Sequence, residues 1–137
     1  MTAAPTELQS NVWRFLELGE LDDARRCIDE AMTTMQTSNQ RWCEAETNRI
    51  AGEIILLSPK RDVARAEAYF EHALTVARQQ QAKSWELRAA MSLARLWRSQ
   101  GKVQQARELL APVYGWFTKG FDVRDLKEAK ALLDALA

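Results

Sequence analysis

The sequence predicts an all-α protein, a right-handed α-solenoid of about three helical hairpins followed by a C-terminal capping helix. Apolar residues recur with the period of a helix along most of the chain, and the alternating Val, Ile and Thr that are typical of strands are missing. A helical pattern that returns after about 40 residues predicts hairpins that stack on one another. Only five Gly and three Pro interrupt the 137 residues, so we expect few breaks between helices.

The clearest hairpin lies between Ser84 and Tyr114. Each of its helices has one apolar face, made of Ala90, Leu93, Ala94 and Trp97 in the first and of Val103, Ala106, Leu110 and Val113 in the second. Gly101 predicts a short turn between them, which makes the helices antiparallel. Ala94 and Ala106 are small residues within these faces, so we expect the closest crossing of the two helices there.

The other helices are predicted from their apolar stripes and end signals. We expect them to cover approximately residues 6–18, 21–35, 42–57, 63–81 and 123–136. Gly19 is expected to end the first helix in a left-handed conformation, and Asp62 and Asp122 are expected to cap the two helices that follow them.

The end of the third hairpin contains a helix breaker. Pro112 predicts a kink because it lacks a backbone donor and crowds the preceding turn. We expect an irregular link from Gly115 onward, with the aromatic run YGWF, residues 114–117, mostly buried. The last helix should turn four residues inward: Leu126, Ala129, Leu133 and Leu136.

Comparison of the chain with itself supports a repeat. Three triplets match along the sequence: Ala24, Ile28 and Ala31; Ala66, Phe70 and Ala73; and Ala106, Leu110 and Val113. A hairpin of this kind cannot bury its apolar face alone and must stack on its neighbours. The sequence therefore predicts a single domain over 1–137, with repeats at about 6–36, 41–81 and 84–117 and a capping helix at about 123–136.

The segments GELDDARRCIDEA and GKVQQARELLAPV resemble the tetratricopeptide repeat pattern: a Gly, an Ala five residues on, then a large and a small apolar residue. The match is best in residues 85–113. The segment from Gly52 to Leu133 also looks like the C-terminal helical segment of bacterial signalling ATPases, many of which carry a class III adenylate or guanylate cyclase domain. The resemblance implies a protein-binding role in signalling. It does not imply the upstream activities, because the chain has no phosphate-binding Gly-Lys loop and no cyclase carboxylates.

Composition and charge bear on localisation and on the class of partner. Nineteen basic and nineteen acidic residues give a formal net charge of zero, so binding to nucleic acid or to an anionic membrane is not expected. The N-terminus has neither a basic region nor an apolar region typical of a secretion signal, and the longest aliphatic run, Ile54 to Leu57, is too short to span a membrane. We expect a cytoplasmic protein with Cys27 and Cys43 as reduced, partly buried thiols.

No arrangement of residues predicts catalysis. His72 is the one histidine, and no carboxylate or Cys follows it at the spacing that a metal site or a general base needs. Acidic pairs such as Asp22 and Asp23 point to different sides of a helix. We therefore expect no enzyme activity, no metal and no cofactor.

The candidate binding site is a row of arginines on the first helix of the best repeat. Arg88, Arg95 and Arg98 share one face of that helix, and Met91 lies between them. The first helices of tetratricopeptide-like stacks line the concave side, where we expect these residues to form a groove that the preceding repeat continues with Asn48, Arg49 and Gly52. Such a groove suits an acidic peptide or a helix with one apolar edge. The alternative is that these arginines are solvated residues paired with nearby glutamates.

Three functional hypotheses follow, one for the N-terminal end and two for the whole chain. The first helix matches its own repeat poorly, so we expect an association surface around Trp13, through a second copy or another repeat. The main hypothesis is a non-catalytic protein-protein interaction module whose partner is an ATPase-type or cyclase-type signalling protein. The alternative is a small-ligand sensor domain with a pocket between helices of adjacent repeats.

Overall fold

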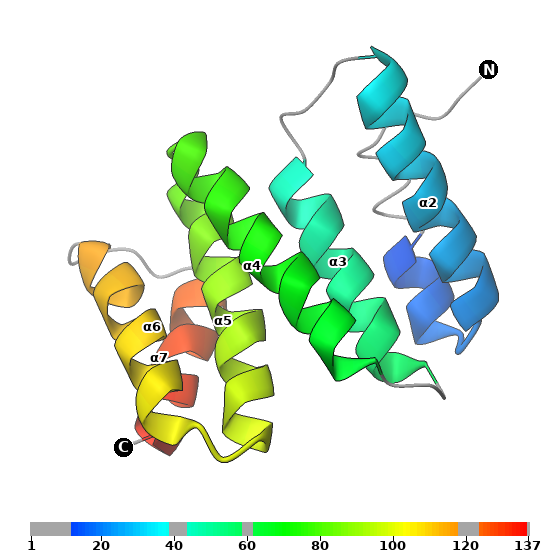
Figure 1. Cartoon of the computed structure of the whole chain (residues 1–137). Helices are drawn as coiled ribbons and strands as arrows, with labels where there is room; N and C mark the ends of the chain where they lie inside the picture. Colours follow the sequence, from blue (N-terminus) through cyan, green and yellow to red (C-terminus); the bar gives the residue numbers. More distant parts are fainter. Residues whose placement is uncertain (1–11, 39–43, 59–61, 118–123, 137) are drawn as a thin grey trace.

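The computed structural model describes residues 12–38, 44–58, 62–117 and 124–136, and the regular secondary structure in these ranges is entirely α-helical. This confirms the all-α prediction. A helical segment at residues 12–17 is followed by six longer helices (Figure 1): α2 (Leu21–Ser38), α3 (Glu44–Leu57), α4 (Val63–Gln79), α5 (Lys83–Ser99), α6 (Val103–Trp116) and α7 (Arg124–Leu136). The predicted helix beginnings near Thr6 and Trp42 and the predicted cap Asp122 lie outside the described residues.

Three turns close by the same backbone hydrogen bonds. The amides of Glu20, Ala82 and Lys102 donate to the carbonyls five residues earlier, at distances of 2.8, 2.9 and 2.8 Å. Each is preceded by a residue in the left-handed region: Gly19 at φ 76°, Gln81 at φ 55° and Gly101 at φ 81°. This is the Schellman ending of a helix, and it satisfies carbonyls of the last turn. The predicted role of Gly19 is confirmed, whereas Gln81 has the same backbone conformation although glutamine is not a residue type that predicts it.

The predicted cap at Asp62 is also confirmed. Its carboxylate accepts a hydrogen bond from the backbone amide of Arg65 at 3.1 Å, at the beginning of α4. This bond satisfies one of the amides that have no partner inside the helix.

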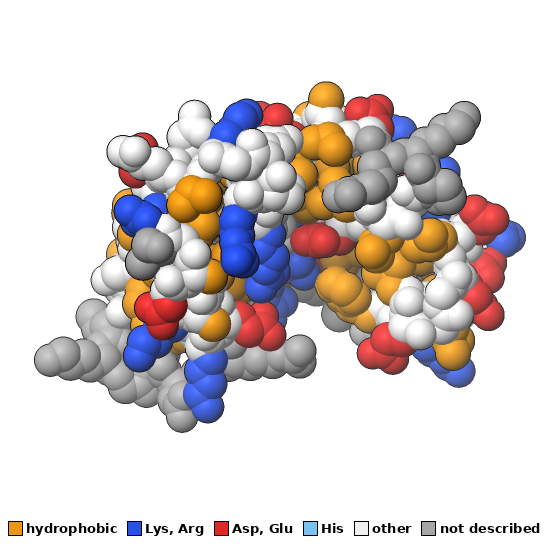
Figure 2. All heavy atoms as spheres, turned by 90° about the horizontal axis from the view of Figure 1, so that it is seen from below, with side chains coloured by type: hydrophobic (Ala, Val, Ile, Leu, Met, Phe, Trp, Pro, Cys, Tyr) orange, Lys and Arg blue, Asp and Glu red, His pale blue; other side chains and the backbone are white. Residues whose placement is uncertain are grey.

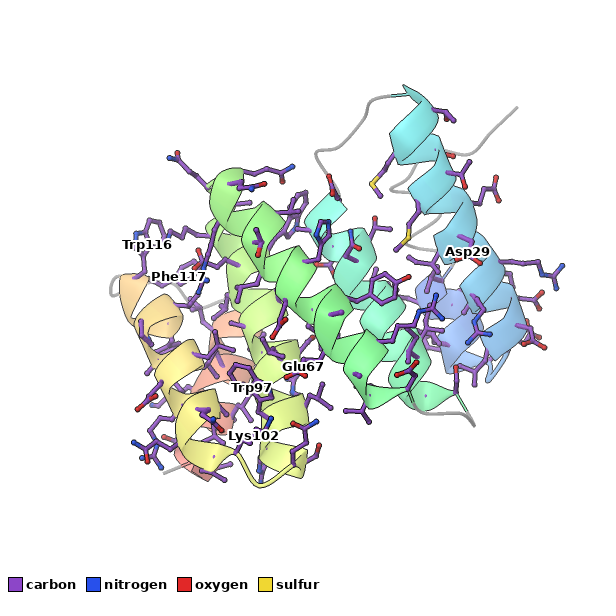
Figure 3. All side chains as sticks on the ribbon, viewed as in Figure 1. Asp29, Glu67, Trp97, Lys102, Trp116 and Phe117 are labelled. Atoms are coloured by element: carbon purple, nitrogen blue, oxygen red, sulfur yellow. The ribbon has the colours of Figure 1, made fainter. Side chains whose placement is uncertain are left out.

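The helices pack on their neighbours in sequence, and α5 also packs on the helices that lie two positions before and after it in the chain. Each of α3 to α6 contacts the helix before and the helix after it, and α5 also contacts α3 and α7 (Figure 1). Consequently α3, α5 and α7 lie side by side, with α5 in the middle. Side-chain bonds also link consecutive helices: for example, Trp97 Nε1 donates to Glu67 Oε1 at 2.5 Å between α5 and α4 (Figure 3), and Arg107 donates to the carbonyl of Leu136 between α6 and α7.

Gly52 allows a close approach of α3 and α4. A Cβ atom added at Gly52 would lie 2.5 Å from Cε1 of Phe70, a side chain that is fully buried. The space beside Gly52 is thus filled by the ring of Phe70. Our expectation that Gly52 continues a binding wall is wrong, because this face of α3 is covered by α4.

The buried apolar side chains include one large cluster over α3 to α7, a smaller one between the 12–17 segment, α2 and α3, and a third of three residues between α3 and α4. Ala94 and Ala106, which we expected at the closest crossing, are both fully buried in the large cluster. Leu126, Ala129 and Leu136 of α7 are buried as predicted, and Leu133 is partly buried. The C-terminal helix therefore covers the apolar edge of α5 and α6.

The end of α6 differs from the prediction. The helix continues through Pro112 to Trp116, so Gly115 and Trp116 are helical rather than part of an irregular link. Trp116 is 55% exposed, which also contradicts the expected burial of this aromatic run. The Trp116 ring packs edge-on against the Phe117 ring, with centroids 5.2 Å apart (Figure 3). The ammonium of Lys83 lies 5.2 Å from the centroid of the Trp116 ring.

Candidate functional site

The molecule is hollowed on one side between its two ends, and Lys and Arg side chains gather in this hollow beside a carboxylate (Figure 2). Ion pairs locate two of the predicted arginines relative to the helices. Arg88 Nη1 lies 3.6 Å from Glu46 Oε2 of α3, and Arg95 Nη2 lies 3.9 Å from Glu128 Oε2 of α7. The Arg88 guanidinium thus lies on the side of α5 that faces α3, and the Arg95 guanidinium lies on the side that faces α7.

The predicted row remains accessible to solvent. The side chains of Arg88 and Arg95 are 40% and 48% exposed, and Arg98, near the end of α5, is exposed as well. The alternative interpretation, arginines paired with glutamates, therefore describes Arg88 and Arg95 in part. At 3.6 and 3.9 Å, these two contacts with glutamates are ion pairs that are too long to be good hydrogen bonds.

Two residues predicted to line the groove are buried. Met91 is only 2% exposed and belongs to the large apolar cluster. Its assignment to the groove is wrong because α3, α4, α6 and α7 all pack on α5, which leaves a narrower exposed stripe than a single hairpin would have. Asn48 is buried too, and its amide donates to the carbonyl of Glu44 at 2.8 Å. Neither side chain can contact a partner in this structure.

Arg49 holds three helical segments together. Its Nε donates to Glu46 Oε1 at 2.9 Å, its Nη1 donates to Ser92 Oγ of α5 at 3.3 Å, and its guanidinium carbon lies 5.6 Å from the centre of the Trp13 ring. The side chain is only 12% exposed. We therefore assign Arg49 a structural role at the edge of the row, instead of the direct contact predicted from the sequence.

Glu46 is the residue at this site that the sequence interpretation missed. Its side chain is 7% exposed, one oxygen accepts from Arg49, and the other faces Arg88. A buried carboxylate between two arginines keeps both guanidinium groups in place. The one sequence signal is local: Glu46 and Arg49 are three residues apart on one helix face.

Trp13, the predicted association residue, lies in the first described helical segment and is 41% exposed. Its ring packs against Arg49, and Val12 beside it is fully buried in the smaller cluster. The indole is therefore anchored on one side and open on the other.

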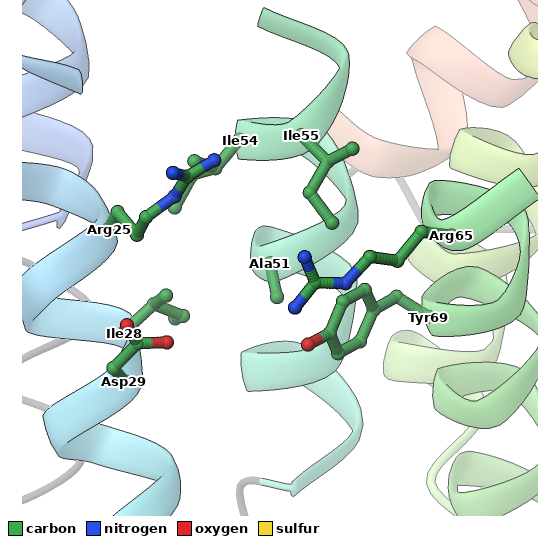
Figure 4. Close-up of a pocket in the computed structure, with 8 residues that line it drawn as sticks. All are labelled: Arg25, Ile28, Asp29, Ala51, Ile54, Ile55, Arg65 and Tyr69. Atoms are coloured by element: carbon green, nitrogen blue, oxygen red, sulfur yellow. The ribbon is translucent and has the colours of Figure 1, made fainter. Parts of the chain in front are cut away.

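A separate cavity of about 120 Å³ lies between α2, α3 and α4 (Figure 4). Its lining combines aliphatic residues with charged and aromatic ones: Arg25, Ile28, Asp29, Ala51, Ile54, Ile55, Arg65 and Tyr69. These residues come from three helices, so no local sequence pattern could have indicated the cavity.

The described residues contain no group of three or more His, Cys, Asp or Glu side chains that could hold a metal ion. His72 Nε2 lies 3.0 Å from Glu44 Oε2, and the imidazole is half-exposed on α4. Burial raises the pKa of the Cys27 thiol, and the nearby Glu30 and Asp23 carboxylates raise it further. A thiol with a raised pKa is less often the reactive thiolate.

None of the described helices has an apolar stretch long enough to cross a bilayer. No protein-family model matches the sequence, and the search of curated proteins finds no match.

Proposed function

We propose that this chain is a tetratricopeptide-like domain, a right-handed α-solenoid of helical hairpins with α7 as its cap. Two observations support the proposal. The middle helix α5 packs on α3 and α7 as well as on its sequence neighbours, as the first helices of stacked hairpins do. The Schellman turns at Gly19 and Gly101 also lie at the same place in the first and third hairpins, between their two helices, whereas the turn at Gln81 joins the second hairpin to the third.

Its function in this proposal is non-catalytic binding of a protein partner through an acidic segment. The observation that carries the proposal is the position of Arg88 and Arg95, whose guanidinium groups lie beside α3 and α7 and remain exposed. With Arg98 they form what we call the arginine row. Guanidinium groups bind carboxylates through two parallel hydrogen bonds, so a row of them favours a peptide with several Asp or Glu residues.

The internal ion pairs do not prevent such binding. Exposed pairs contribute about 0–1 kcal/mol each, because solvent and salt screen them. Glu128 is itself 40% exposed, so a partner carboxylate can replace it beside Arg95 at little cost. Glu46 is buried and cannot leave, and it therefore keeps Arg88 close to α3 while a second carboxylate binds the outer side of the guanidinium.

We further propose a cytoplasmic signalling role, with a protein of the ATPase or cyclase type as the partner and with self-association around Trp13 as a second contact. The segment from Gly52 to Leu133 resembles helical segments of such proteins, and this resemblance supports the choice of an ATPase-type or cyclase-type partner. The formal net charge of zero is consistent with a protein partner rather than nucleic acid or an anionic membrane.

Selection of peptides from a random display library on the immobilised protein tests this function. We expect the selected peptides to be rich in Asp and Glu and their affinity to fall as salt rises. Replacing Arg88, Arg95 and Arg98 together by Gln should weaken binding at least tenfold. A matched variant that loses the same charge elsewhere, with Arg26, Lys102 and Lys130 replaced by Gln, should bind nearly as well as the unchanged protein. Equal losses in both variants, or selected peptides without acidic residues, would contradict the proposal.

The alternative function, a small-ligand sensor, is supported by one observation. The cavity of about 120 Å³ lies between α2 of one proposed hairpin and α3 and α4 of the next, where such a sensor would hold its ligand.

A further inference from the structure

The cavity between α2, α3 and α4 has charged residues on facing walls. Figure 4 shows Arg25 and Asp29 on α2 and Arg65 and Tyr69 on α4, on opposite sides of the same space. Ala51, Ile54 and Ile55 of α3 lie between the two walls. The arginine row is on α5, so the cavity is a separate feature of the molecule.

The deep part of the cavity is aliphatic. Ile28, Ala51, Ile54 and Ile55 are all buried, and the whole cavity, including the part beside the charged residues, has a volume of about 120 Å³. An apolar cavity of about 150 Å³ is enough to hold benzene. The space therefore fits a branched aliphatic group of about four or five carbon atoms, which would contact the isoleucines without needing a hydrogen bond.

The outer part of the cavity favours a negative charge. Two arginines and one aspartate line it, which leaves an excess of positive charge. The guanidinium carbon of Arg65 lies 5.8 Å from the centre of the Tyr69 ring, a cation-π distance that restricts its position. Arg25 Nη2 donates to Ser58 Oγ at 3.4 Å, a weak bond that a carboxylate can replace.

From these observations we propose that the cavity binds a small branched aliphatic carboxylate. The aliphatic group lies on Ile28, Ala51, Ile54 and Ile55, and the carboxylate lies between the guanidinium groups of Arg25 and Arg65. Asp29 is placed to accept a hydrogen bond from an ammonium group if the ligand carries one. This inference is independent of the acidic-peptide proposal, because the two sites share no residue.

Binding would connect two helices through the ligand. Arg25 belongs to α2 and Arg65 to α4, so one carboxylate between them bridges successive hairpins (Figure 4). A ligand that binds only the folded state stabilises that state, and once its concentration exceeds Kd the stabilisation grows with the logarithm of the ratio of concentration to Kd. We therefore expect the melting temperature to rise with ligand concentration.

Calorimetric titration and thermal melts of the full chain test the proposal with three probes: 3-methylbutanoate, leucine and 3-methylbutylamine. We expect saturable binding of at least one of the two carboxylates and none of the amine, which has a similar aliphatic group but no carboxylate. Tighter binding of leucine that is lost in Asp29→Asn would identify an amino acid as the preferred form of the ligand. Tighter binding of 3-methylbutanoate would identify a simple carboxylic acid.

The variants make the test specific. Arg25→Gln and Arg65→Gln should each weaken binding about tenfold, the loss expected for one charged hydrogen-bonding partner. Arg26→Gln is the matched control: Arg26 is the next residue on the same helix, it is exposed and paired with Asp23 at 2.7 Å, and its loss should leave the affinity unchanged. Absence of saturable binding of both carboxylates up to about 10 mM, equal binding of the amine, or unchanged affinity in both Arg25→Gln and Arg65→Gln would overturn the proposal.

Discussion

At the scale of single residues, Glu46 determines where two arginines of the candidate site lie. It accepts a hydrogen bond from Arg49 and faces Arg88, and its side chain is 7% exposed. A carboxylate in this environment is stabilised by its two partners, and they in turn depend on it. Removing one member of such a group leaves a buried charge without compensation, which costs more than the ion pair itself contributes.

Glu46→Gln should therefore destabilise the protein by about 2–4 kcal/mol, because Arg49 then keeps a buried positive charge. Urea denaturation measures the change. The control is Glu128→Gln, which removes the exposed partner of Arg95 and should change the free energy of unfolding by less than about 0.5 kcal/mol. Similar stability of the two variants would mean that burial does not distinguish these carboxylates.

Gln81 has a positive φ of 55°, where a side chain is strained and Gly is not. Gln81→Gly should stabilise the protein by about 0.5–1 kcal/mol, since the other two Schellman turns already have Gly at this position. Gln80, with φ of −83°, provides the control. Gln80→Gly should be neutral or destabilising, and a gain in melting temperature for this variant alone would refute the explanation.

At the scale of helices, the positions of the elements were predictable because helical periodicity is local. Most helix boundaries that can be compared agree with the prediction to within about two residues, which is the usual uncertainty of such boundaries. Met91 was misplaced for a non-local reason: four helices pack on α5, and the number of neighbours determines how wide its buried face is. The end of α6 was misplaced because we expected Pro112 to end the regular helix soon after it. Proline removes only one backbone donor, and the helix continues beyond it to Trp116. The cavity joins α2, α3 and α4, so its residues share no local pattern.

The contact between α3 and α4 depends on Gly52. Gly52→Ala should destabilise the protein by about 1–3 kcal/mol, because the added methyl group would lie 2.5 Å from the buried ring of Phe70. Gly115→Ala is a helical control with nothing within 4 Å of the added group. It should stabilise α6 by up to about 1 kcal/mol through its higher helix propensity.

Combining Gly52→Ala with Phe70→Leu should cost less than the sum of the two single changes, since the smaller side chain relieves the contact. Additive losses in thermal or urea unfolding would show that the methyl group does not meet Phe70.

At the scale of the whole molecule, the two ends differ in what covers them. At the C-terminal end, α7 packs on α5 and α6 and buries Leu126, Leu132 and Leu136. In the first described segment, Trp13 is 41% exposed and Leu18 is exposed as well. Exposed apolar groups favour association between molecules when they form a contiguous patch.

We expect concentration-dependent self-association, which Trp13→Gln should weaken and which light scattering after size exclusion would detect. Trp116→Gln is the control, since Trp116 is a similarly exposed indole at the other end of the molecule. A monomer at all concentrations, or equal weakening in the two variants, would contradict an association surface at Trp13.

In the proposed function, the arginine row binds acidic segments. Nuclear magnetic resonance of the arginine Nε–H groups, recorded during titration with a glutamate-rich peptide, tests this binding residue by residue. We expect saturable shifts for Arg88, Arg95 and Arg98, the three members of the row, and smaller shifts for arginines on other helices, such as Arg26 and Arg107. Shifts concentrated on Arg26 and Arg107, or equal small shifts of all arginines that disappear with added salt, would contradict it.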